Sequence, residues 1–498
     1  MNDKAGIEEF PSDAYRETVL RPAFLGAKSH LQYIRRIDRA HLVMLAEQAI
    51  LPSADAATIL AALPQIDAEL DLDAMKDAGR FEDLFFLLED RLIARLGPEL
   101  GGSLHVARSR NDLEATTFKM ALKTRLRAAM GQLCDLLAAL LGVARREQST
   151  VIVAYTHGQP AQPTTMGHYL GAIIESLLRQ HERLSDAYRT VDLCPLGAAA
   201  ITTTGFPIDR HRTASLLGFA APQENSYGCI ASVDYLTATY SALKLALLDI
   251  GRLCQDLAFW CGFEVNQLRA SNGFVQVSSI MPQKRNPLAI EHARTMASIG
   301  AGQCETVIGT VHNTPLADMV DAESPTQQAG YGAFDSFART TRLLAALVSG
   351  LTINRDSVER NIAASFITMT ELADSLARLE GISFRTAHHV TSHLVRAMSA
   401  SDLRMSDLNE ALLGSSFESV VGRPPRLRGE ELRRLIEAEH FVSVRQAFGG
   451  PGAAALEASL GRYEDQLDAY IAGNQVLAQA EAQSTEQLYN AVREICER

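Results

Sequence analysis

The apolar residues between positions 235 and 261 constrain the possible fold of this chain more than any other feature. In "YLTATYSALKLALLDIGRLCQDLAFWC" the large apolar side chains recur at steps of three and four residues: Leu236, Tyr240, Leu243, Leu247, Ile250, Leu253, Leu257 and Trp260. This spacing predicts one helix, about 40 Å long at about 1.5 Å per residue, with an apolar seam along one side. Because such a seam is stable only when other helices cover it, the segment predicts a bundle.

Two further segments carry the same spacing. The first contains Leu122, Leu126, Met130, Leu133, Leu137 and Leu140, and the second contains Met166, Tyr169, Ile173, Leu177, Leu178, His181 and Leu184. We interpret these side chains as core residues that pack between helices. The sequence has neither a regular alternation of strands and helices nor a glycine-rich phosphate loop. We therefore expect an all-α fold built around an elongated helical bundle.

Changes in pattern along the chain predict three domains. Residues 1–107 mix short helical patterns and are expected to form a mostly helical N-terminal domain, while residues 108–355 carry the long seams and form the central bundle. In residues 356–498 shorter helical patterns are broken by stretches rich in glycine and proline, such as "GSSFESVVGRPPRLRG". Short helical patterns separated by such helix-breaking residues predict a small helical C-terminal domain.

Charge and cysteine content narrow the class of function. The 498 residues carry a formal net charge of −12, which argues against nucleic acid as a partner and requires any site for an anion to be a local positive cluster. The seven cysteines are scattered without a CxxC pair, a pattern typical of reduced thiols in the cytoplasm. The acidic N-terminus lacks an apolar signal segment, and no charge-free run is long enough to span a bilayer. We expect a soluble cytoplasmic protein that does not associate with membranes.

Three polar islands interrupt the helical patterns: "HVARSRNDLEATT", "YTHGQPAQPTT" and "SSIMPQKRNP". They contain hydrogen-bonding or cationic side chains suited to holding carboxylates, namely Ser109, Arg110 and Asn111, then Thr156, His157 and Gln159, and finally Ser278, Ser279, Lys284 and Asn286. Each island also has a simpler interpretation. The first could cap the following helix, the second could hold an ordinary loop histidine, and the third could be a solvated loop with a basic tip.

Taken together, the islands resemble the signature regions of the argininosuccinate lyase branch of the aspartase/fumarase superfamily. The superfamily pattern SSxMPxKxNP is matched by Ser278, Ser279, Met281, Pro282, Lys284, Asn286 and Pro287, and "GFPIDRHRTASLLGF" and "FRTAHHV" also resemble segments of this branch. The resemblance covers most of the chain. It implies a three-domain subunit and a homotetramer with a twenty-helix central bundle. It also implies active sites that each take one island from three different subunits.

The resemblance further implies the chemistry, a reversible anti β-elimination that releases fumarate from an N-substituted L-aspartate. Ser278 corresponds to the base, Lys284 to its counter-charge and a stabiliser of the aci-carboxylate, and His157 to the group that protonates the departing nitrogen. The matching substrate-binding residues are Ser109, Arg110, Asn111, Thr156, Gln159, Ser279, Met281 and Asn286. Lys284 at about 4 Å is worth about 4 kcal/mol, too little to ionise a serine alone, so we expect backbone donors to assist. We expect no cofactor and no metal, although His389 and His393 have a spacing seen in metal sites.

The chain departs from the branch where the amine half of the substrate binds. In "PLADMVDAESP", Asp318 replaces a tyrosine, Glu323 falls near a glutamine and a lysine is missing; Val233 replaces an arginine, and Phe85 replaces a histidine. Asp83, Asp318 and Glu323 are therefore the amine-side candidates. The favoured substrate is an aminopolycarboxylate such as ethylenediamine-N,N′-disuccinate (EDDS), and a true argininosuccinate lyase is the main alternative. A non-catalytic structural homologue and an adenylosuccinate-type cleavage are further alternatives.

Overall fold

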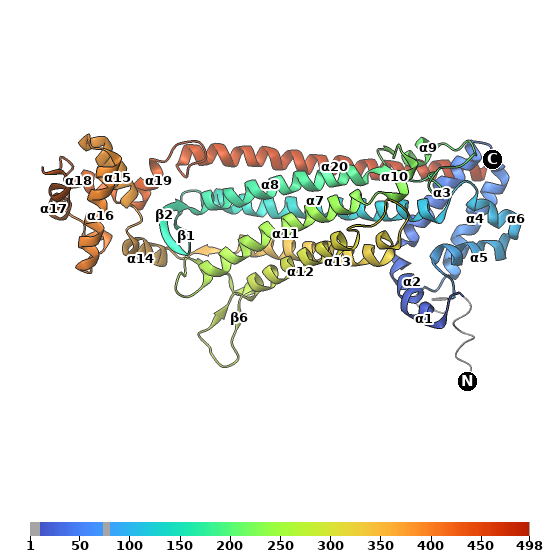
Figure 1. The fold of residues 1–498 in the computed structure, drawn as a ribbon, viewed down its shortest axis with the longest axis horizontal. Helices are drawn as coiled ribbons and strands as arrows, with labels where there is room; N and C mark the ends of the chain where they lie inside the picture. The colour runs from blue at the N-terminus through green and yellow to red at the C-terminus, as the bar shows by residue number, and fades with distance from the viewer. Residues whose placement is uncertain (1–9, 73–79, 498) are drawn as a thin grey trace.

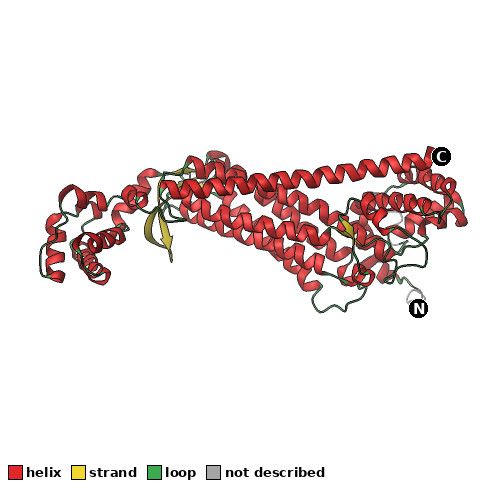
Figure 2. Ribbon diagram, turned by 90° about the horizontal axis from the view of Figure 1, so that it is seen from above, coloured by secondary structure: helices red, strands yellow, loops and turns green. Residues whose placement is uncertain are grey.

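The computed structural model describes residues 10–72 and 80–497 and has an elongated shape dominated by long, roughly parallel helices (Figures 1 and 2). The central bundle consists of α7 (Arg110–Arg146), α8 (Met166–Val191), α11 (Asp234–Cys261), α12 (Leu288–Thr310) and α13 (Ser324–Ser349). The predicted all-α bundle is confirmed, and α11 coincides with the segment whose seam suggested it. All eight seam residues of α11 are buried, none more than 4% exposed.

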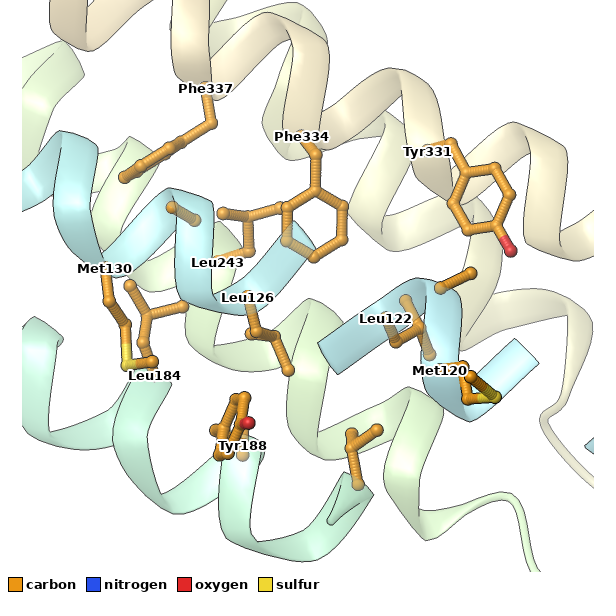
Figure 3. Packing of buried hydrophobic residues seen from close by; sticks show 14 of the residues in the cluster. Met120, Leu122, Leu126, Met130, Leu184, Tyr188, Leu243, Tyr331, Phe334 and Phe337 are labelled. Atoms are coloured by element: carbon orange, nitrogen blue, oxygen red, sulfur yellow. The ribbon is translucent and has the colours of Figure 1, made fainter. Parts of the chain in front are cut away.

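The seams meet inside the bundle, as Figure 3 shows. Leu122, Leu126 and Met130 of α7 lie among Leu184 and Tyr188 of α8, Leu243 of α11, and Phe334 and Phe337 of α13, all within one buried cluster. Because the side chains repeat every turn, this packing continues along the whole length of each helix. Of the described helices, α7 alone is long and apolar enough to cross a membrane, but 56% of its most apolar stretch is buried in the bundle, as in a core helix of a soluble protein.

The N-terminal region lies at the end of the bundle where α7 begins (Figure 1). Its elements are α1 (Asp13–Tyr15), a π-helical turn (Arg16–Leu20), α2 (Arg21–Ala27), a 3₁₀ turn (Lys28–His30), α3 (Leu31–Glu47), α4 (Ser53–Glu69), α5 (Leu84–Leu96), α6 (Pro98–Gly102) and a second 3₁₀ turn (Ser103–His105). The helices from α2 to α6 share the core cluster of the central bundle.

Short strands and turns carry the connections between the long helices. The antiparallel hairpin of β1 (Val151–Thr156) and β2 (Gln159–Thr165) joins α7 to α8. Shorter pairs are β3 (Leu193–Cys194) with β4 (Ala221–Pro222), β5 (Leu268–Arg269) with β8 (Thr352–Ile353), and β6 (Gln276–Val277) with β7 (Arg285–Asn286). The remaining connecting elements are α9 (Arg210–Leu216), α10 (Ser226–Ala231) and 3₁₀ turns at Asn272–Phe274 and Val320–Ala322.

A second hydrophobic cluster lies at the opposite end of the molecule (Figures 1 and 2). The helices of this region are α14 (Arg355–Ser365), α15 (Met369–Glu380), α16 (Phe384–Ala400), α17 (Glu410–Val421), α18 (Gly429–Leu435) and α19 (Ala438–Ser443), with a 3₁₀ turn at Met405–Asp407. The final helix, α20 (Ala453–Glu497), runs back along α7 and α8 to the N-terminal region, and its buried side chains belong to the central cluster. The predicted domain boundaries stay predictions.

Candidate active site

The first polar island lies at the start of α7, where it caps the helix. The Ser109 side-chain oxygen accepts a hydrogen bond from the Asn111 N–H at 3.4 Å, and the Asp112 carboxylate accepts one from the Ser109 N–H at 2.8 Å. This reciprocal capping box satisfies backbone donors that the first turn of a helix leaves free. Asn111 also donates to the Ala200 carbonyl at 3.1 Å, which fixes its amide beside the loop that follows β3.

Asp112 connects this helix start to the loop. Its second carboxylate oxygen accepts hydrogen bonds from the N–H groups of Gly197 at 2.8 Å and Ala199 at 2.9 Å, and its side chain is fully buried. Burial raises the pKa of Asp112 to about 6, an effect that the three backbone donors partly oppose. The carboxylate therefore holds Ser109 and the 197–199 segment in one arrangement.

Replacing Asp112 with asparagine is expected to lower the free energy of unfolding by about 1–3 kcal/mol, because an amide NH₂ then faces a buried backbone donor. Chemical denaturation of the variant and the wild type at pH 7 measures the difference. Asp135→Asn is the matched control, since Asp135 lies on the same helix but is exposed. Equal unfolding midpoints for the two variants would contradict this assignment.

Arg110, expected to bind a substrate carboxylate, is paired with acidic groups of its own chain. Its guanidinium lies 2.8 Å from the Asp83 carboxylate and 3.1 Å from that of Glu82, and it stacks over the Phe86 ring at 4.7 Å. Asp83 also caps α5 by accepting the Phe86 N–H at 3.0 Å. An incoming carboxylate therefore has to compete with Glu82 and Asp83 for this cation.

A cavity of about 580 Å³ opens beside Arg110. It lies between the N-terminal helices, the start of α5, the first turns of α7 and the segment 314–325. The cavity brings together all three amine-side candidates and two of the predicted substrate-binding residues: Asp83, Asp318, Glu323, Arg110 and Asn111. Val233 and Phe85, which replace cationic or ionisable residues of the branch, line it as well.

The lining of this cavity is strongly acidic. Besides Asp83, Asp318 and Glu323 it includes Glu82, Glu114 and Asp321, which were not among the amine-side candidates. Glu114 follows Arg110 by four residues on α7, so its position on the same helix face is readable from the spacing. Burial raises the pKa of both Asp318 and Glu323, and the Asp318 carboxylate raises that of Glu323 further. A cavity with many carboxyl groups and one arginine is suited to a cationic ligand.

The second island forms the turn of the β1–β2 hairpin at the other end of α7 (Figure 1). His157 and Gly158 are the two turn residues, with φ angles of 54° and 74°, as a tight hairpin turn of right-handed strands requires. Thr156 and Gln159 pair across the turn, and all four residues are exposed. The 37 residues of α7 separate this turn from the first island by about 55 Å.

The third island is a loop closed by the β6–β7 hairpin, which projects from the side of the bundle (Figure 1). Val277 pairs with Arg285 at the end of the hairpin, and Ser278 and Lys284 are the loop residues next to this pair. The Ser278 side-chain oxygen accepts backbone hydrogen bonds from Ile280 at 3.4 Å and Met281 at 3.1 Å. These two contacts are the kind of backbone donors that the sequence argument required.

The rest of the loop is open to solvent. Ser279, Met281 and Lys284 are exposed, Asn286 is partly buried, and Ile280 is 83% exposed. One chain therefore does not bring the three islands together: the first lies at one end of the bundle, the second at the other end, and the third projects from the side (Figure 1). A site that uses all three islands needs residues from more than one chain.

Comparisons with known proteins agree with the fold and with the family resemblance. A family model described as "Lyase" matches residues 38–301, and one described as "Argininosuccinate lyase C-terminal" matches residues 366–443. "Argininosuccinate lyase 2" of Agrobacterium fabrum is 50% identical over 97% of this chain and 96% of its own length. "Argininosuccinate lyase 1" of Shouchella clausii is 31% identical over 97% of both chains.

Among solved structures, EDDS lyase in complex with formate superposes with a TM-score of 0.87 and 28% identity, covering 96% of this chain and 93% of that chain. A fumarate lyase from Mesorhizobium sp. BNC1 shares the fold, with a TM-score of 0.70 and 18% identity. The fold, the family models and the similar sequences together show that the chain is a lyase of the aspartase/fumarase superfamily. Within it, the chain belongs to the argininosuccinate lyase family and is a fumarate-releasing carbon–nitrogen lyase.

Proposed function

We propose that the protein catalyses reversible anti β-elimination of fumarate from an N-substituted L-aspartate whose amine half is cationic. The family supplies the reaction class. The observation that carries the substrate class is the acidic cavity beside Arg110 and Asn111, where the carboxyl groups outnumber the cation. A positive amine gains attraction from these groups, whereas an anionic one is repelled.

The chemical step is assigned to the third island. Ionised Ser278 removes the proton from the carbon beside one carboxylate, and the electron pair is held as an aci-carboxylate near Lys284 and Asn286. The carbon–nitrogen bond then breaks, and the nitrogen leaves with a proton from His157. Two backbone N–H groups already point at the Ser278 oxygen, and a positive charge on Lys284 beside it would lower its pKa further. Both effects favour the alkoxide over the hydroxyl.

The dicarboxylate portion is assigned to the remaining residues of the islands. Arg110 and Asn111 lie in the cavity wall next to Ser109. Thr156 and Gln159 flank His157 in its hairpin, while Ser279 and Met281 follow the proposed base. Each of these residues is at least partly exposed, so all are accessible to a ligand or a neighbouring chain.

We further propose a homotetramer in which each active site takes one island from three different chains. The spread of the islands over the bundle supports this assembly. So do large apolar side chains that face outward from the central helices, namely Leu245 and Leu248 of α11, at 40% and 46% exposed, and Ile299 of α12, at 53%. Exposed apolar positions on core helices are typical of surfaces that pack against other subunits.

We also infer a cytoplasmic location. All seven cysteines are free, and five of them are buried: Cys134, Cys194, Cys229, Cys254 and Cys304. A protein secreted into an oxidising environment would usually use such residues in disulfides.

EDDS and argininosuccinate are the two candidates to separate. EDDS lyase is among the similar structures, and argininosuccinate lyases are among the similar sequences. EDDS carries a second succinyl group whose two carboxylates would enter the acidic cavity. The arginine half of argininosuccinate carries two cationic groups and a single carboxylate. The charge of the cavity therefore favours argininosuccinate, or another cationic amine, over the EDDS preferred from the sequence.

A panel of amines tests this assignment. Purified protein is incubated with fumarate and L-arginine, ethylenediamine or N-(2-aminoethyl)aspartate, and the loss of fumarate is followed by its ultraviolet absorbance. The cationic amines are expected to react at least about tenfold faster than the aminopolycarboxylate, because like charges in the cavity oppose the latter. Faster use of N-(2-aminoethyl)aspartate would assign EDDS as the substrate. Consumption of none of the amines would favour a non-catalytic homologue.

A further inference from the structure

Glu114 is a carboxyl group in the cavity for which the proposed reaction has no role. It lies one helical turn beyond Arg110 on α7, lines the same cavity and is partly buried. Within residues 10–72 and 80–497 its side chain makes no hydrogen bond or ion pair. A carboxyl group in this position has lost much of its hydration without gaining a partner.

The groups of the same chain that surround Glu114 do not supply a free cation. From the start of α5 it faces Asp83, with Glu82 beside it, and from the segment 314–325 it faces Asp318, Asp321 and Glu323. Arg110 on its own helix is already paired with Glu82 and Asp83.

The other polar side chains of the cavity wall do not compensate for this charge. His30, on the N-terminal wall, is hydrogen-bonded to the Tyr331 hydroxyl at 3.0 Å, and burial lowers its pKa to about 4, so it is neutral. Tyr235 of α11 is also neutral, because burial raises its pKa.

This environment determines the charge state of Glu114 in the free protein. Burial raises the pKa of Glu114 to about 8, and the carboxylates of Glu323, Asp83 and Asp318 add to the effect while Arg110 opposes it. At pH 7 the folded protein therefore keeps a proton on this carboxyl group. A cation placed beside Glu114 would lower the pKa of this carboxyl group and so favour its ionised form.

We propose that Glu114 binds the positive charge of the amine half and gives up its proton to solvent when that charge enters the cavity. The neutral carboxyl and the free cation become a carboxylate–cation pair, and one proton is released. Glu114 is in this way a specificity-determining residue, since a neutral amine half would leave it protonated and unpaired. The inference rests on the proposed function only in taking this cavity as the amine half of the site.

The sign of the pH dependence follows from proton release. Binding of the cation competes with a proton below the pKa of Glu114, so affinity increases as pH rises and becomes constant above about pH 9. Between pH 7 and pH 9 the dissociation constant of a permanently charged cation should fall about tenfold. Ethylguanidinium is a suitable probe, because it stays charged over this range and has no other titrating group.

The test measures ethylguanidinium binding by ligand-observed NMR at several pH values. Glu114→Gln, which mimics the protonated carboxyl, is expected to bind the probe at least about tenfold more weakly at pH 9 and without pH dependence. Glu89→Gln is the matched control, because Glu89 is partly buried with a raised pKa but lines a different cavity. It is expected to bind as the wild type does.

Three results would overturn the proposal: no binding of the probe to the wild type, binding that does not change with pH, or Glu114→Gln binding within about twofold of the wild type at pH 9. Circular dichroism and size-exclusion chromatography confirm that each variant is folded. Failure of the lyase assignment would give a different result from failure of the Glu114 proposal. A wild type that binds the probe through Glu114 but adds no amine to fumarate would refute the reaction and leave this site in place.

Discussion

Replacing Ser278 with alanine is expected to lower kcat for fumarate formation by at least about 10³-fold, because loss of a positioned general base costs about 10²–10⁴-fold. The rest of the loop should be retained, since the β6–β7 pairing that closes it uses residues on either side of position 278. The measurement is the steady-state rate with the best substrate from the amine panel. Fumarate binding should survive, because no dicarboxylate contact is assigned to this hydroxyl.

The control for this variant is Gln283→Ala, an exposed residue of the same loop to which no role is assigned. It is expected to keep kcat within about threefold of the wild type, as surface substitutions usually do little. A Ser278→Ala protein that keeps more than a tenth of the wild-type kcat would show that another group removes the proton.

Mixing two inactive variants is expected to restore activity if active sites are shared between chains. Ser278→Ala and His157→Asn each disable one island. In tetramers assembled at random from equal amounts, a site receives both native islands with a probability of one half times one half, so activity should recover to about a quarter of the wild type. The variants are expressed together or refolded together, and specific activity is compared with that of each variant alone.

The control for the mixing experiment is a chain that carries both substitutions. Mixed with the Ser278→Ala chain, it leaves no native residue at position 278 and should give no recovery. If islands two and three of each site came from a single chain, the first mixture would also remain inactive. The β1–β2 turn lies at the end of the bundle and the β6–β7 loop projects from its side (Figure 1), which makes recovery the expected result.

The central helices could be predicted from the sequence because their apolar side chains repeat with the period of a helix. Every seam residue chosen on α7 and α11 is buried. The long final helix was not foreseen as part of the bundle, because its buried apolar residues are spread thinly over its 45 residues: Leu456, Leu460, Leu467, Leu488, Ala491 and Ile495. Ion pairs of Arg145 with Glu457 and Glu464, both at 2.6 Å, also attach it to α7. An ion pair between residues so distant in sequence cannot be inferred from the pattern of either segment alone.

The types of residue at the site could be predicted better than their arrangement. Spacing within the "SRND" and "SSIMPQKRNP" segments specifies local geometry, such as the cap of α7 and the turn at Ser278. The raised pKa of Glu114 depends instead partly on Asp318 and Glu323, which come from a segment some two hundred residues later. In the sequence alone it is one polar residue near the start of a helix.

The uninterrupted length of α7 has a consequence for how this protein can change. The helix carries the first island at its start and leads into the second just beyond its end. Inserting one residue would move the far hairpin by about 1.5 Å and rotate it by about 100° relative to the start. Insertions or deletions within α7 should therefore be poorly tolerated, because each one changes both the distance and the angle between the two islands at its ends.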